Sequence, residues 1–130
     1  MTVVDASAVL EVLLRAPGSA ALEARLFAPG ESLHAPHLLD VEVAQVLRRY
    51  ASSGEIDDER GRRALADLVE FPVERYGHEP LLDRVWQLRD NVTAYDAVYL
   101  ALAEALGAPL VTRDARLARA PGHAAVVELL

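Results

Sequence analysis

Four carboxylates in apolar surroundings are the residues of this 130-residue sequence best suited to chemistry. They are Asp5, Glu42, Asp96 and Asp114, and each stands where a strand or loop gives way to an expected helix. An ionised carboxylate on an apolar surface costs free energy unless it is paired, hydrogen-bonded or bound to a cation. A divalent ion with oxygen ligands removes the repulsion between grouped carboxylates. The four acids therefore predict a site for Mg²⁺, with Mn²⁺ as the alternative ion.

Each acid also has a plain structural explanation. Asp5 and Asp114 could cap the helices that follow them, and Asp96 stands at the third position of a possible capping box. Glu42 could complement the dipole in the first turn of its helix, but that explains its position along the helix and not its place within the apolar stripe. Tyr99 shares the face of Asp96, which must be the buried face. For each acid alone, a structural role and a role in a metal site both stay open. Whether the four acids lie together in the fold decides between these roles.

Short apolar strands alternate with helices along the chain, which we expect to form one domain over residues 1–130. The expected strands are 2–4, 32–35, 72–75, 110–112 and 125–128, and the expected helices are 6–14, 19–27, 37–52, 57–70, 79–89, 94–106 and 115–120. This alternation predicts an α/β fold whose parallel sheet is covered on both faces. In such sheets ligands bind beyond the carboxyl ends of the strands. Asp5 and Asp114 follow two of these ends directly.

Two hydroxyl residues accompany these acids. Ser7 and Thr112 each lie two residues from Asp5 and Asp114, respectively. Their hydroxyls could join a metal shell or orient a carboxylate. The alternative is the ordinary use of Ser and Thr at helix starts and strand ends.

Composition excludes several classes of protein. The net charge of −7 disfavours binding of nucleic acid through a broad basic surface. Individual arginines or metal ions would therefore have to contact the phosphates. All 13 basic residues are arginine, which excludes lysine-dependent chemistry, and the absence of cysteine excludes thiolate sites. No signal peptide or membrane-length apolar run is visible. We therefore expect a cytoplasmic protein that does not associate with membranes.

Four stretches of the sequence together resemble the PIN-domain family, and specifically the VapC-type ribonuclease toxins of type II toxin–antitoxin pairs. They are residues 3–7, 38–47, 93–103 and 110–114, whose order and spacing are specific although each is weak alone. The resemblance covers nearly the whole chain. It implies a three-layer α/β/α sandwich with a central parallel sheet.

The resemblance also implies an activity and partners. Family members are Mg²⁺-dependent endoribonucleases that cleave single-stranded regions of RNA with metal-activated water, form homodimers, and are inhibited by a cognate VapB-type antitoxin. Position by position, Asp5, Glu42, Asp96 and Asp114 match the acidic quartet of the family, and Ser7 and Thr112 match its hydroxyl positions. On this hypothesis Asp5 and Asp96 are direct metal ligands. Arg113 and Arg116 border the last acid and are candidates for contact with RNA phosphates.

Other functions remain open at this point. The chain could be a catalytically silent PIN-like binding module whose acids serve only as caps, or a metal-dependent phosphatase. A pair of histidines, His34 and His37, could instead cleave RNA without a metal by general acid–base catalysis. A phosphate-receiver domain is disfavoured, because it needs a lysine that this chain lacks.

Overall fold

The computed structural model describes all 130 residues and contains one five-stranded parallel sheet of order β3-β2-β1-β4-β5. The strands are β1 (Thr2–Val4), β2 (Leu33–Pro36), β3 (Val73–Tyr76), β4 (Leu110–Thr112) and β5 (Val127–Leu129). All four strand pairings are parallel, as expected from the sequence. The strand after Pro72 lies at an edge of the sheet, where a missing backbone N–H is tolerated.

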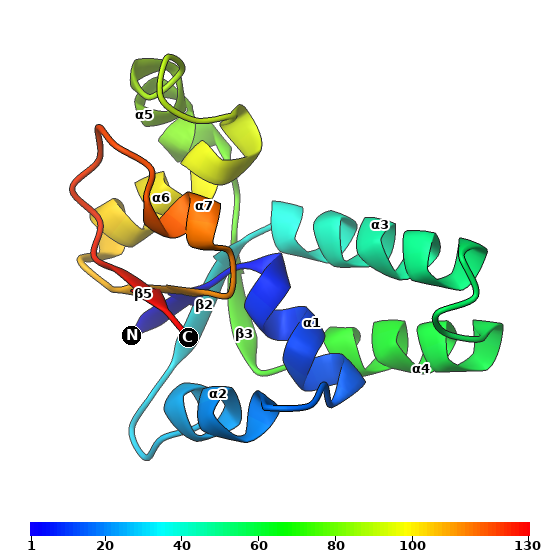
Figure 1. The fold of residues 1–130 in the computed structure, drawn as a ribbon. Helices are drawn as coiled ribbons and strands as arrows, with labels where there is room; N and C mark the ends of the chain where they lie inside the picture. The colour runs from blue at the N-terminus through cyan, green and yellow to red at the C-terminus, as the bar shows by residue number, and fades with distance from the viewer.

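Helices connect the strands (Figure 1). They are α1 (Ala6–Leu14), α2 (Ser19–Leu26), α3 (Leu38–Ser52), α4 (Asp58–Val69), α5 (Leu82–Gln87), α6 (Ala94–Leu106) and α7 (Ala115–Ala118). The expected helix over 79–89 divides into a 3₁₀ turn at Glu79–Leu81 and α5, which ends at Gln87. Helices α3 and α4 lie side by side and extend away from the sheet.

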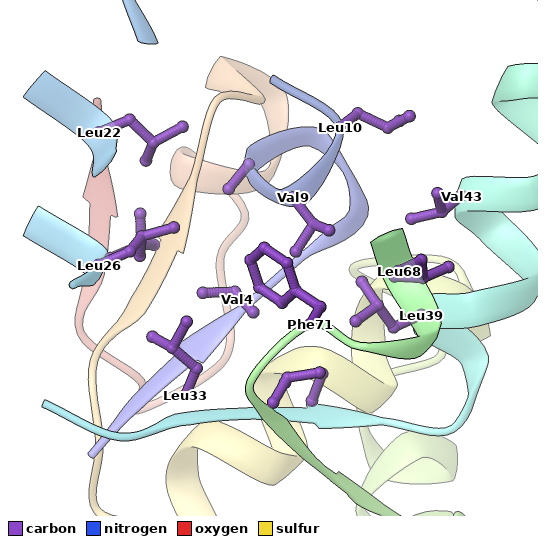
Figure 2. Close-up of a cluster of buried hydrophobic side chains, with 14 of the residues drawn as sticks. Val4, Val9, Leu10, Leu22, Leu26, Leu33, Leu39, Val43, Leu68 and Phe71 are labelled. Carbon is purple, nitrogen blue, oxygen red and sulfur yellow. The ribbon is translucent and has the colours of Figure 1, made fainter. Parts of the chain in front are cut away.

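Two apolar clusters cover the two faces of the sheet. Val4 packs in one cluster with residues of α1 to α4, and its neighbour Val3 packs in the other with residues of α6. Successive residues of a strand point to opposite faces, so this division places helices on both sides of the sheet. Figure 2 shows the first cluster, in which Phe71 lies between Val4 and Val9. The fold is the three-layer α/β/α sandwich that the sequence predicts.

Helices α2 and α4 differ in whether their leucine and valine side chains are buried or exposed. Leu22 and Leu26 of α2 are fully buried in the first cluster, whereas Leu65 and Val69 of α4 are exposed. Of these two helices, only α4 therefore offers apolar side chains to a partner. No helix has both the length and the apolar character needed to cross a membrane.

The strand order has a switch point between β1 and β4. From β1 the chain proceeds to β2 and β3 on one side, and it returns to β4 and β5 on the other side. In open parallel sheets, ligands bind at such a switch point, outside the carboxyl ends of the strands. Asp5 directly follows β1, and Asp114 lies two residues after β4. The topology thus brings the first and last predicted acids to one edge.

Candidate active site

Asp5 is held by three donors at the carboxyl end of β1. It is 5% exposed, and its Oδ1 accepts hydrogen bonds from the Ala8 backbone N–H at 3.1 Å and from Ser7 Oγ at 2.6 Å. Thr112 Oγ1 donates to its Oδ2 at 2.5 Å. Burial raises the pKa of Asp5, the three hydrogen bonds lower it, and the nearby Asp114 charge raises it. Asp5 is therefore both the cap of α1 and a rigidly held carboxylate.

The two hydroxyl residues tie β1 to β4. While donating to Asp5, Ser7 Oγ accepts a hydrogen bond from the Arg113 backbone N–H at 2.9 Å. Thr112 Oγ1 donates to the same carboxylate and accepts from the Asp114 backbone N–H at 2.9 Å. Each hydroxyl thus uses one donor and one acceptor function to join Asp5 to the loop that carries Asp114. The structure supports an orienting role for Ser7 and Thr112.

Glu42 comes from α3 and contacts the opposite helix layer. Tyr99 of α6 donates a hydrogen bond from its hydroxyl to Glu42 Oε1 at 2.6 Å. Burial raises the pKa of Glu42, the bond from Tyr99 lowers it, and the charges of Asp96 and Asp5 raise it. The sequence analysis placed Tyr99 on the buried face of α6 but did not identify it as a site residue. Its spacing of three residues from Asp96, one helical turn, was the available signal.

Asp96 and Asp114 share a cation supplied by the chain itself. The Arg116 guanidinium lies with Nη1 3.0 Å from Asp96 Oδ2 and Nη2 3.3 Å from Asp114 Oδ2. Asp114 caps α7, as expected, by accepting the backbone N–H groups of Arg116 and Leu117. The backbone N–H of Asp96 is in turn bonded to the side chain of Thr93. In both acids the Oδ2 oxygen therefore contacts a positive charge.

The four acids interact electrostatically but do not form a ready-made metal shell. No three Asp, Glu or His side chains lie close enough together to hold a metal ion as they are placed. The donor set is nevertheless all oxygen and anionic, which is the chemistry that Mg²⁺ and Mn²⁺ prefer. Two of its members already bind a guanidinium. Ligation by three acids requires side-chain rotation and, for Asp96 and Asp114 together, release of Arg116.

The side chains of Arg113 and His34 bond to residues other than the four acids. The Arg113 side chain forms an ion pair with Glu11 of α1, with Nε 2.8 Å from Oε1. His34 is 5% exposed, and its two ring nitrogens contact Ser32 Oγ at 2.8 Å and Tyr76 Oη at 2.7 Å. His34 is thus buried away from solvent with both nitrogens in use. The geometry does not support a catalytic His34–His37 pair.

Comparison with known proteins adds independent findings. The model of the PIN domain matches residues 2–123. Ribonuclease VapC1 of Mycobacterium tuberculosis is 47% identical over 129 residues, which cover 98% of this chain and 96% of that protein. Among solved structures, PAE2754 of Pyrobaculum aerophilum has a TM-score of 0.71 at 26% identity, covering 97% of this chain and 87% of that one.

A further solved structure supports the fold alone. VapBC2 of Rickettsia felis, bound to a DNA fragment from its promoter, has a TM-score of 0.64 at 14% identity, covering 98% of this chain and 97% of that one. The family model spans most of the sequence, and the similarity to VapC1 extends over nearly its full length. The chain therefore belongs to the PIN domain family and, within it, to the VapC group.

Proposed function

We propose that this chain is a metal-dependent endoribonuclease toxin that cleaves single-stranded regions of RNA. The observation that carries the proposal is the placement of Asp5, held by three donors at the switch point of the sheet, within electrostatic reach of Glu42 and Asp114. A cap of α1 needs only the bond to Ala8. The additional bonds from Ser7 and Thr112 orient a carboxylate that faces other carboxylates, which suits a ligand and not merely a cap. The name of the relative VapC1 supports RNA as the substrate.

The metal has a role that the acids by themselves cannot perform. When bound, Mg²⁺ or Mn²⁺ would supply positive charge at the scissile phosphate and make a water molecule more acidic. Asp5 and Asp96 would hold the ion directly, and Glu42 and Asp114 would do so directly or through water. Ser7 and Thr112 keep Asp5 in place and favour its ionised form. We expect products with 5′-phosphate and 3′-hydroxyl ends.

Arg116 connects the acids to the substrate. Its side chain is 67% exposed, so it can leave Asp96 and Asp114 without unfolding α7. Once displaced by a metal ion, the guanidinium would lie beside the site and could contact an RNA phosphate. Arg113 is the weaker candidate for this role, because its side chain is 34% exposed, against 67% for Arg116.

A VapB-type antitoxin is the proposed partner, with a segment that covers the acids and inhibits them. VapBC2 of Rickettsia felis resembles this chain in fold, and the VapC name of the curated relative suggests the same pairing. The anionic site would also accept an arginine from such a partner. We further propose a homodimer, to which exposed Leu65 and Val69 of α4 could contribute apolar contacts.

The experiment compares purified wild type with Asp5→Asn, Asp96→Asn and Asp57→Asn. Asp57 is a matched control, because it caps α4 through the Arg60 N–H but has no site role. The wild type and Asp57→Asn should cleave single-stranded RNA with Mg²⁺ and stop when EDTA is added, whereas the other two variants should be inactive yet folded. Full activity in Asp5→Asn would contradict the proposal.

Two further measurements on the same proteins separate two alternative functions. A silent binding module whose acids are only caps would show no rise in melting temperature on titration with Mg²⁺, whereas a true site stabilises the fold by linkage. A metal-dependent phosphatase would hydrolyse a small phosphate monoester faster than RNA. Cleavage of RNA without monoester hydrolysis supports the ribonuclease.

A further inference from the structure

We propose that Tyr99 is a positioning residue for the nuclease reaction, because it fixes the carboxylate of Glu42 toward the other acids. This inference rests on the proposed function and names a residue outside the acidic quartet. Tyr99 would act through Glu42 and would not contact the substrate itself.

The geometry links α3 and α6, which pack in the two different apolar clusters of the sandwich. Tyr99 is 2% exposed, and its hydroxyl donates to Glu42 Oε1 at 2.6 Å across a separation of 57 residues in sequence. Tyr99 follows Asp96 by three residues on α6. One helix therefore carries both an acid of the site and the hydroxyl that holds the acid of α3.

Glu42 depends on this single bond. Asp5 has three hydrogen-bond donors, and Asp96 and Asp114 share Arg116, but Glu42 has no other hydrogen bond or ion pair in the structure. A hydroxyl that donates to a carboxylate forms a strong, directional bond. Without it, the Glu42 side chain would be free to choose among rotamers. Tyr99 is thus the one residue that holds the Glu42 carboxylate by a hydrogen bond.

The position of the Tyr99 hydroxyl favours this role over simple core filling. The side chain is buried, and its hydroxyl ends at a carboxylate of the acidic quartet, to which it donates a hydrogen bond. Phenylalanine would fill the same core volume without the bond.

The test compares Tyr99→Phe with Tyr95→Phe, which removes a hydroxyl from the same helix at a residue that is 63% exposed. Loss of a residue that orients a metal ligand typically costs about 10–100-fold in metal affinity or activity. We expect Tyr99→Phe to weaken Mn²⁺ binding, followed by calorimetry or electron paramagnetic resonance, by about 10-fold or more. The kcat for RNA cleavage should fall with little change in KM. Tyr95→Phe should bind Mn²⁺ like the wild type.

A double-mutant cycle separates positioning from a general effect on the fold. If Tyr99 acts through Glu42, adding Tyr99→Phe to Glu42→Ala, which has no acceptor for the Tyr99 hydroxyl, should change Mn²⁺ affinity much less than it does in the wild-type background. An equal loss in both backgrounds would overturn the proposal, because Tyr99 would then act without Glu42. So would a Tyr99→Phe variant whose Mn²⁺ affinity and kcat match those of the wild type.

Failure of the proposed function can be told apart from failure of this inference. A wild type that neither binds Mn²⁺ nor cleaves RNA would contradict the proposed function. The positioning of Glu42 is then decided in the metal-free protein by the carbon-13 chemical shift of its carboxyl group at one pH. Tyr99→Phe should move that resonance and Tyr95→Phe should not; an unmoved resonance in Tyr99→Phe would overturn the inference.

Discussion

Thr112 and Asp5 are joined by a hydrogen bond of 2.5 Å, although 107 residues separate them in sequence. Thr112 is the last residue of β4, and Asp5 is the first residue after β1, so the bond joins the ends of two neighbouring parallel strands. Thr112 is fully buried and Asp5 is 5% exposed, so the bond lies inside the protein. The bond therefore serves the stability of the fold and the orientation of the carboxylate together.

Replacing Thr112 by Val should destabilise the protein by about 1–3 kcal/mol, the usual cost of leaving a buried acceptor unpaired. Valine has nearly the shape of threonine but cannot donate to Asp5. Urea denaturation at pH 7 measures the loss, and Thr112→Ser is the control, because serine retains the hydroxyl. Equal stability of the valine variant and the wild type would show that the bond contributes nothing.

Glu42→Gln should stabilise the metal-free protein at pH 7 while abolishing activity. Burial raises the pKa of Glu42 above 4.5, the usual value of a glutamate side chain, so the folded state binds the proton more tightly than the unfolded chain. Its contribution to stability is thus present below pH 4.5 and is lost as the pH rises through the folded pKa. Glutamine has no charge to bury and can still accept the bond from Tyr99. Each 1 kcal/mol regained would raise Tm by about 2–8 °C.

Calorimetry in EDTA between pH 4 and pH 8 tests the direction in which the stability effect of Glu42 changes with pH. The advantage of Glu42→Gln should shrink toward pH 4, and an advantage independent of pH would refute the explanation. Glu104→Gln is a control for which the opposite pH dependence is expected. Arg84 lowers the pKa of Glu104, so the stabilisation from this carboxylate is present above its usual pKa of 4.5 and is lost as the pH falls through the folded pKa. Glu104→Gln should therefore lower Tm at pH 7.

Arg116→Ala should tighten Mn²⁺ binding, because the guanidinium competes with the metal for Asp96 and Asp114. The effect should be modest, about 2–5-fold, since exposed ion pairs contribute little and are screened by salt. Titration at low and high ionic strength measures it, and the gain should diminish as salt is added. Arg119→Ala is the control, because its side chain forms no ion pair with the acids. Weaker Mn²⁺ binding in Arg116→Ala would mean that Arg116 assembles the site instead.

Arg15→Gly should stabilise the protein by about 0.5–1 kcal/mol. Arg15 ends α1 with a φ of 51°, the only non-glycine residue with a positive φ, and glycine adopts this left-handed conformation without steric cost. Arg15→Ala keeps the strain and should not show the gain. Chemical denaturation of both variants provides the comparison, and a less stable glycine variant would contradict this prediction.

Local signals predicted most of the architecture. Thr93 and Asp57 begin their helices as capping residues, and Gly107 ends α6 in the left-handed conformation, because caps depend on residues close in sequence. The same locality explains why Asp5 and Asp114 could be recognised at strand ends. The division of the expected helix over 79–89 could not be predicted from Pro80, because proline is compatible with the first turn of an α-helix.

The capping residues Asp5, Thr93 and Asp114 and the parallel sheet could thus be inferred from residue type and spacing, whereas the role of the four acids as one site stays a prediction. Which group satisfies each carboxylate could not be inferred, because Thr112, Tyr99 and Arg116 reach their partners only after the strands and helices pack. Spacing places a side chain on a face of its own element but says nothing about the element opposite. The bonds that orient Asp5 and Glu42, and the guanidinium between Asp96 and Asp114, are consequences of tertiary packing.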